Sequence, residues 1–340
     1  MSHSCHPRPK LSRVMLALAA FLTFGTLAAP RAEAAEFTVK LGTLAPKSSL
    51  HGKVFATWEK AVSEKSGGRL ELQIFYNGQQ GDEGAMVAKV KSGQLHGVAV
   101  SGVGLGKVHK PITALQMPGL FASWAKLDKA RDALSAELGK GAKDAGFEIL
   151  GWYDIGRSRS FSRGFAVRVP DDLENKKPLL WRDDVILSAL YPAIGGVSAV
   201  SLALPEVLAN LNVGALDSLF ASALEAEQFQ WASKLDHLGA EVHAYHVGGL
   251  VFSAKFLDSL PADLRGILVD TAKVAAAALK TRIRSEDEAA FVRLSGKMTR
   301  VTRTSAELEK WTALYKTVRA RLAQGTFAPE LVTRLEELAR

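Results

Sequence analysis

The chain has 340 residues, 47% of them hydrophobic, and a net charge of +8 at pH 7. This length suffices for two domains of ordinary size or one large domain, each with its own core, and the single cysteine excludes a disulfide framework. The basic residues are spread along the chain, which argues against nucleic acid as a partner and favours anionic small molecules or envelope surfaces.

The first 34 residues have the pattern of a cleavable signal peptide. Basic residues within 1–13 precede an uncharged apolar stretch from Val14 to Ala29, and Ala32-Glu33-Ala34 supplies small residues at the spacing that a signal peptidase reads. Because this stretch is shorter than the roughly 20 residues of a membrane span, we expect cleavage after Ala34. Cys5 precedes the stretch, so it is not the lipid-bearing cysteine of a lipoprotein. The mature chain is expected to be soluble and periplasmic.

The next part of the chain alternates between strand and helix patterns. Alternating apolar residues predict strands at Phe37–Leu41, Leu70–Ile74, Val98–Val100 and Phe147–Tyr153. Helical spacing and end signals predict helices from Ser49 to Gly67, Gly84 to Ser92 and Lys126 to Ala145. This order implies a parallel sheet with helices on both faces, in which ligands bind at the carboxyl ends of the strands.

The pattern restarts at about Arg168 and predicts a second α/β lobe. Strands are expected at Leu179–Trp181 and Val200–Leu202, with helices from Val185 to Gly195, at Pro205 and from Ala223 to Lys234. The rest is predicted to be helical, from Ala262 to Met298, from Ser305 to Gln324 and from Pro329. The expected organisation is a signal peptide over 1–34, lobe I over 35–158, lobe II over 159–254 and a helical segment over 255–340.

Motifs for enzyme chemistry are missing from the sequence. It has no Gly-x-Ser-x-Gly elbow, Walker loop, cysteine pair or His-Glu-x-x-His, so we expect no enzyme activity and no cofactor. His243 and His246 lie in a strand-like stretch that directs them to opposite faces, so no metal site is expected. The repeat Gly102-x-Gly104-x-Gly106 is interpreted as a glycine-rich strand-to-loop connection beneath a ligand.

Six segments, in order, resemble the DctP-type substrate-binding subunit of tripartite ATP-independent periplasmic (TRAP) transporters. Among them are Ser-Gly-Gly-Arg, Asn-Gly-Gln and Gly-Asp-Glu elements, the LQMPGLF stretch and a Pro-Asp-Asp-Leu element. The segments are residues 39–62, 64–100, 115–121, 169–182, 202–217 and 255–268.

This resemblance implies a two-lobed periplasmic binding protein of the type II-like class, with mixed sheets, crossing strands and a long helix spanning both lobes. Such a receptor closes on a small organic acid and delivers it to membrane permease subunits driven by an ion gradient. A periplasmic helical-repeat lipoprotein is a further partner that the resemblance implies. The alternative functions are a periplasmic sensor or scaffold with the same fold, or a hydrolase, which would need a nucleophile and a base in the cleft.

The resemblance also implies which residues bind the ligand. Arg182 matches the arginine that holds the ligand carboxylate in the family, and a guanidinium suits this role because it donates two parallel hydrogen bonds. Arg159 matches a second basic residue, with Arg157 and Arg163 as alternatives. The complete candidate set is Arg182, Arg159, Phe220, Asp217, Ser222, Trp152, Met117, Ser101 and Glu83.

Two departures from the family pattern bear on the ligand. The run from Asp217 to Ser222 contains Leu219 and Phe220 where the family commonly has polar residues, which predicts a less polar pocket wall. Arg182 is followed by Asp183 and Asp184, and either carboxylate could occupy the guanidinium. Both departures favour a hydrophobic monocarboxylate over a dicarboxylate or sialic-acid type of ligand.

Overall fold

A computed structural model describes residues 35–340, so the signal peptide predicted over 1–34 lies outside the described residues. The first strands and helices agree with the predicted βαβαβ order, and Ser49 caps the first helix by accepting a hydrogen bond from the Gly52 amide. The strands β1, β2 and β3 are parallel, with β1 between the other two. These elements are β1 (Phe37–Thr43), α1 (Leu50–Lys65), β2 (Leu70–Phe75), α2 (Glu83–Lys91) and β3 (Gly97–Ser101).

Two long antiparallel strands continue the sheet beyond β3. The strand β9 (Ala244–Ser253) pairs with β3 on one side and β4 on the other. The strand β4 (Phe147–Ser162) is 16 residues long, whereas the sequence pattern predicted only its first half. The sheet is therefore mixed, and the prediction of parallel strands holds for β1 to β3 only.

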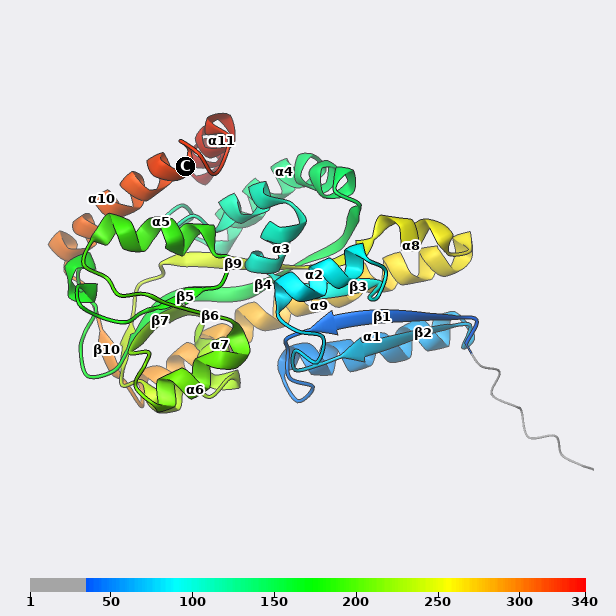
Figure 1. Ribbon diagram of the computed structural model, residues 1–340, viewed down its shortest axis with the longest axis horizontal. Helices are drawn as coiled ribbons and strands as arrows, with labels where there is room; N and C mark the ends of the chain where they lie inside the picture. Colours follow the sequence, from blue (N-terminus) through cyan, green and yellow to red (C-terminus); the bar gives the residue numbers. More distant parts are fainter. Residues whose placement is uncertain (1–34) are drawn as a thin grey trace, which may run out of the picture. The chain divides into compact units, whose positions relative to one another are not determined.

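The second half of β4 carries the strands of the other lobe. There β4 pairs with β7 (Ser218–Ala221) and β8 (His237–Gly239), and β8 pairs with β10 (Thr299–Val301). A separate two-stranded parallel sheet joins β5 (Leu179–Trp181) to β6 (Val200–Leu202). This mixed, two-lobed arrangement with crossing strands confirms the predicted fold class (Figure 1).

The helices of the second lobe agree with the sequence pattern, except that one predicted helix ends early. The helix predicted from Ala223 to Lys234 is interrupted at Gln230, whose φ of 62° is left-handed and ends regular helix. The helical elements here are η2 (Pro170–Leu173), α5 (Val185–Ile194), η3 (Leu204–Glu206), α6 (Val207–Asn212), α7 (Ala223–Gln228) and η4 (Trp231–Lys234).

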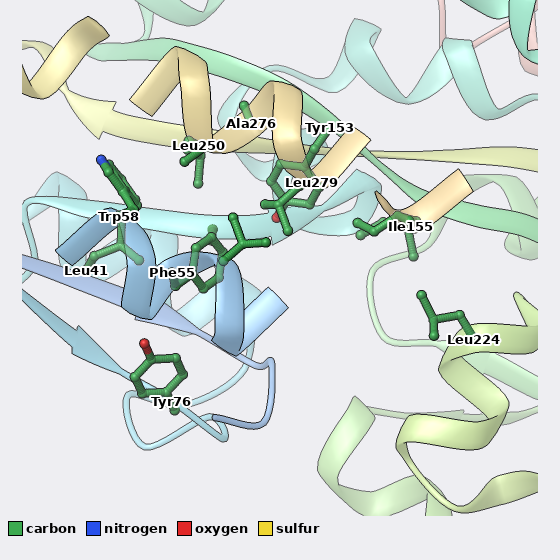
Figure 2. Close-up of a cluster of buried hydrophobic side chains, with 14 of the residues drawn as sticks. Leu41, Phe55, Trp58, Tyr76, Tyr153, Ile155, Leu224, Leu250, Ala276 and Leu279 are labelled. Carbon is green, nitrogen blue, oxygen red and sulfur yellow. The ribbon is translucent and has the colours of Figure 1, made fainter. Parts of the chain in front are cut away.

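The 34-residue helix α9 (Ala262–Ser295) packs on elements from both halves of the described chain, contacting α1, β4 and α7. Small residues allow this close approach: a Cβ on Gly151 of β4 would lie 2.4 Å from the Ala276 methyl group. Figure 2 shows Ala276 and Leu279 of α9 in one cluster with Phe55 and Trp58 of α1.

The remaining helices surround these sheets, and one corrects a prediction. Residues Gly102–Val108 form the helix α3, not a loop, and the glycines leave room for neighbours: a Cβ on Gly102 would lie 1.8 Å from the Gln116 side chain. None of the helices within residues 35–340 is long and apolar enough to span a membrane. The other helices are η1 (Lys110–Gln116), α4 (Trp124–Asp144), α8 (Ala254–Ser259), α10 (Ser305–Leu322) and α11 (Pro329–Ala339).

Candidate functional site

A cleft lies where the carboxyl ends of β1 and β3 and the amino ends of α1, α2 and α3 face the segments that follow β5 and β6. Residues of β4, α7 and β9 complete its lining. The cleft and its open mouth together enclose about 1110 Å³ of space. Its polar and aromatic lining residues include His51, Asp82, Glu83, Ser101, Gln116, Tyr153, Trp181, Arg182, Asp183, Asp184, Glu225, Gln228, Phe229 and His246.

Arg182 lines this cleft directly after β5. Its Nη1 donates to Asp82 at 3.1 Å and its Nη2 donates to Glu206 at 2.8 Å, while 46% of the side chain remains exposed. Since Asp82 caps α2 and Arg182 follows β5, the first ion pair connects opposite walls of the cleft. The guanidinium is accessible to a ligand, but two carboxylates compete for it.

The two aspartates after Arg182 do not occupy its guanidinium, contrary to the alternative raised from the sequence. Asp183 forms an ion pair with Lys107 of α3 at 3.0 Å, and its φ of 70° places it in the left-handed region. Asp184 caps α5, accepting hydrogen bonds from the amides of Ile186 and Leu187. Burial raises the pKa of Asp184 to about 6, against these two bonds.

Glu83 and Ser101, both predicted from the sequence, lie together in the cleft. The Glu83 carboxylate accepts hydrogen bonds from the Ser101 amide, the Ser101 hydroxyl and the Gly104 amide, each at 2.7 Å. Burial raises the pKa of Glu83, and these three donors oppose that effect. The three bonds tie the start of α2 to the junction of β3 and α3, so Glu83 and Ser101 hold the cleft wall in shape.

Glu225 of α7 contributes a second carboxyl group, which is half-buried. Its Oε2 accepts bonds from the Ser222 amide at 3.0 Å and the Ser222 hydroxyl at 2.8 Å, which closes a capping box. Within residues 35–340, its Oε1 accepts no hydrogen bond from the protein. Burial, with smaller contributions from the charges of Asp287 and Glu83, raises the pKa of Glu225 to about 7.

Two histidines and a tyrosine add neutral polar groups to the lining. Burial lowers the pKa of both His51 and His246 to about 4, so both rings are uncharged near neutral pH. The Tyr153 hydroxyl donates to the Val100 carbonyl at 2.9 Å. The Tyr153 and His51 rings are arranged edge to face, with their centres 5.8 Å apart. Figure 2 shows Tyr153 close to the long helix α9.

Arg159 does not line the cleft, although the resemblance assigned it to the ligand. Its side chain is 3% exposed, with the guanidinium carbon 4.1 Å from the centre of the Phe291 ring and Nη1 3.9 Å from Asp287. Burial lowers the pKa of Arg159 to about 10. The two alternatives lie outside the lining too, because Arg157 pairs with Asp287 and Glu288 while Arg163 donates to backbone carbonyls.

Five further candidates also lie outside the lining. Phe220 is stacked on His243 with ring centres 4.3 Å apart, so it does not form the apolar wall expected of it. Asp217 accepts two hydrogen bonds from the Lys177 amide, and Ser222 is the cap of α7. The Met117 side chain belongs to a buried hydrophobic cluster, and the Trp152 side chain packs against that cluster.

His51, Glu225 and His246 were missed as cleft residues by the sequence reasoning. His51 falls inside the first resembling segment, just after a strand, and this position was its available signal. Glu225 follows Ser222 at the spacing of a capping box, a pattern that indicates the start of a helix and gives no sign of a cleft residue. Residues 35–340 contain no cluster of three or more metal-ligating side chains.

A two-lobed α/β chain with an arginine in the cleft has the architecture of a periplasmic solute-binding protein. The chain belongs to the family of bacterial extracellular solute-binding proteins, family 7 (DctP), which matches residues 41–325. This confirms the resemblance found in the sequence. The family is one of binding proteins.

Individual relatives agree with this assignment. A solute-binding protein of Verminephrobacter eiseniae is 28% identical over 258 residues, which cover 75% of this chain and 76% of that protein. Among solved structures, a sugar acid binding protein of Advenella mimigardefordensis in complex with galactonate has a TM-score of 0.83 at 18% identity, covering 90% of this chain and 99% of that one. A TRAP periplasmic solute-binding protein of Sulfurospirillum deleyianum with bound succinate has a TM-score of 0.82 at 20% identity, covering 89% and 99%. These structures share the fold.

Proposed function

We propose that this protein is a periplasmic receptor that binds a small organic acid in the cleft around Arg182 and delivers it to a TRAP-type permease. The observation that carries the proposal is the Arg182 guanidinium, which lies half exposed in the cleft of a chain from this family. Each charge-assisted hydrogen bond from a guanidinium to a carboxylate contributes about 1.5–3 kcal/mol.

The class of acid is supported by the lining and by the relatives. The structures with similar folds hold succinate and galactonate, which are polar acids. The argument from Phe220 for a hydrophobic monocarboxylate loses its support, since that ring lies outside the cleft lining. Trp181, Phe229 and Tyr153 still provide apolar area, so the proposed ligand is a small carboxylic acid with both a polar and an apolar part.

Delivery requires that the permease distinguish the ligand-bound form of the receptor from the free form. We propose lobes at 35–158 and 159–254, joined by β4 and β9 and spanned by the helical segment 255–340. A ligand favours closure only if it binds the closed state more tightly than the open one. The Asp82–Arg182 ion pair connects the two proposed lobes, so a ligand carboxylate that displaces Asp82 must replace a contact that already joins them.

The permease and the periplasmic location are part of the proposal, supported by the family and by the signal peptide pattern over 1–34. The helical-repeat lipoprotein finds no support in the comparisons and stays a prediction from the resemblance.

The test is native mass spectrometry of the mature protein purified from cells, followed by denaturing extraction of any bound molecule. We expect a small acid that is present in the wild type and absent from Arg182→Ala. Arg293→Ala is a matched control, because Arg293 is 44% exposed and also pairs with two carboxylates, Glu227 and Glu286, away from the cleft. A bound acid that survives Arg182→Ala would contradict the proposed role of Arg182.

A further inference from the structure

The cleft lining holds more carboxyl groups than basic groups. Its lining residues include one arginine, Arg182, and five carboxyl groups, and both lining histidines are neutral because burial lowers their pKa to about 4. Burial also raises the pKa of three of the carboxyl groups, so a ligand that brings only negative charge would disfavour their ionised forms further. The five carboxyl groups belong to Asp82, Glu83, Asp183, Asp184 and Glu225.

Most of these carboxyl groups already have partners within the protein. Asp82 pairs with Arg182, Asp183 pairs with Lys107, and Glu83 accepts three hydrogen bonds from its own surroundings. Asp184 accepts two amide bonds as the cap of α5. Both bonds to Glu225 come from Ser222 to Oε2, and both amide bonds to Asp184 go to Oδ1, so each group has a second oxygen that accepts no hydrogen bond within residues 35–340. Of the two, Glu225 shares its helix with an aromatic residue of the lining, Phe229.

Aromatic side chains line the same cleft as Glu225. Phe229 follows Glu225 by four residues at the end of α7, so both project from the same side of the helix, and both line the cleft. Trp181 lines it too, and Trp231 connects the two, with ring centres 5.7 Å from Trp181 and 5.1 Å from Phe229. A carboxylate next to aromatic faces is a favourable environment for an ammonium group.

We propose that the ligand is a zwitterion, with its carboxylate bound by Arg182 and its cationic nitrogen bound by Glu225 and the rings of Trp181 and Phe229. This inference rests on the proposed function and adds a second charged group to the ligand. The nitrogen supplies a donor to Glu225 Oε1, and its positive charge favours the ionised form of that carboxyl group, whose pKa burial raises to about 7. The ligand class is therefore amino acids and related ammonium or betaine acids.

The competing ligand is an acid without nitrogen, such as a hydroxy acid, whose hydroxyl group would donate to Glu225. A neutral donor bonds the oxygen but brings no positive charge that would favour the ionised form of Glu225. Hydrogen bonds that involve charged groups are roughly twice as strong as neutral ones, so an ammonium ligand should be preferred. Acids that differ only in this one group separate the two possibilities.

The experiment measures affinities by calorimetry on protein unfolded and refolded to remove bound molecules. The probes are three pairs of acids that carry either an ammonium or a hydroxyl group at C2: alanine and lactate, leucine and 2-hydroxy-4-methylpentanoate, phenylalanine and 3-phenyllactate. We expect an amino acid to bind about tenfold or more tightly than its hydroxy partner. Glu225→Gln should remove that preference, since an amide keeps an oxygen for Ser222 but loses the charge.

Glu227→Gln is the matched control, because Glu227 lies on the same helix and pairs with Arg293 outside the cleft lining. It should leave the preference unchanged. Hydroxy acids that bind as tightly as their amino partners, or a preference that survives Glu225→Gln, would overturn the inference and leave the proposed function standing. If no acid of either kind binds and none is extracted from the purified protein, the proposed function fails as well.

Discussion

The buried ion-pair network around Asp154 offers a direct test of how the crossing strand is held. Asp154 of β4 is fully buried and accepts bonds from Arg131 of α4 at 2.9 Å and from Arg284 of α9 at 2.5 Å. Arg131 is itself 3% exposed. Both arginines also bind Asp128 of α4, at 2.6 and 2.7 Å. One carboxylate thus connects two helices to the strand that carries Tyr153 and Ile155 of the cleft.

We expect Asp154→Asn to lower the free energy of unfolding by about 3 kcal/mol. Removing one partner of a buried ion pair costs roughly 3–5 kcal/mol. The lower end applies here, because the asparagine keeps an oxygen acceptor and both arginines retain Asp128. For a mature chain of this size, that loss corresponds to a decrease in Tm of about 5 °C.

The assay is thermal unfolding of the mature protein followed by circular dichroism, with Asp144→Asn as a control. Asp144 is 63% exposed and pairs with Lys140 on the surface of α4, so its substitution should cost less than about 0.5 kcal/mol. Equal Tm values for the two variants would refute the reasoning, because they would mean that the buried network contributes no more than an exposed pair.

Three other outcomes follow from the structure. Asp82→Asn should raise the affinity for the acid that co-purifies by about two- to fivefold, measured by calorimetry. The reason is that an exposed ion pair worth about 0.2–1 kcal/mol no longer competes for Arg182. A tenfold decrease would mean that Asp82 contacts the ligand. Phe220→Asn should lower the Tm by several degrees without changing the order of ligand affinities, since the ring is 3% exposed and packs on His243 and Trp311. A changed order of affinities would mean that Phe220 does form part of the pocket wall. Burial alone would raise the pKa of Asp128, but the bonds from Arg284 and Lys280 lower this pKa overall. The ionised Asp128 therefore stabilises the folded protein above the unfolded-state pKa of about 3.9, and this stabilisation is lost as the pH falls below that value. Acid titration of Asp128→Asn should show a smaller loss of stability between pH 5 and 3, and an unchanged titration would contradict this assignment.

Local patterns identified most of the secondary structure because each depends on neighbours along the chain. Ser49 was predicted to cap a helix, and it does so by bonding an amide three residues later. The alternation in β1 and β2 was recognised because one face of each strand is buried. Gln230 interrupts the predicted helix through a left-handed backbone conformation that its side-chain type does not indicate.

Only part of the cleft was predictable in the same way. Arg182 was predicted from its match to the arginine of the resembling family. Together with Ser101 and Glu83, it lies at the end of a strand or the start of a helix, where ligands bind in α/β folds. Arg159 and Phe220 lie on the crossing strand and its partner, and their sequence neighbours do not indicate which side of the sheet faces the cleft. The register shifts between Ile149 and Gly151 and between Asp154 and Gly156 change that side within β4.

The sequence by itself determined the family, the α/β class and the arginine in the cleft, because these depend on motifs and periodicities that are local. Only the tertiary structure decided which charges meet. Asp82 and Arg182 are 100 residues apart and form an ion pair across the cleft. Side-chain pairing over such separations is a property of packing, and the charge balance that a ligand meets is set there.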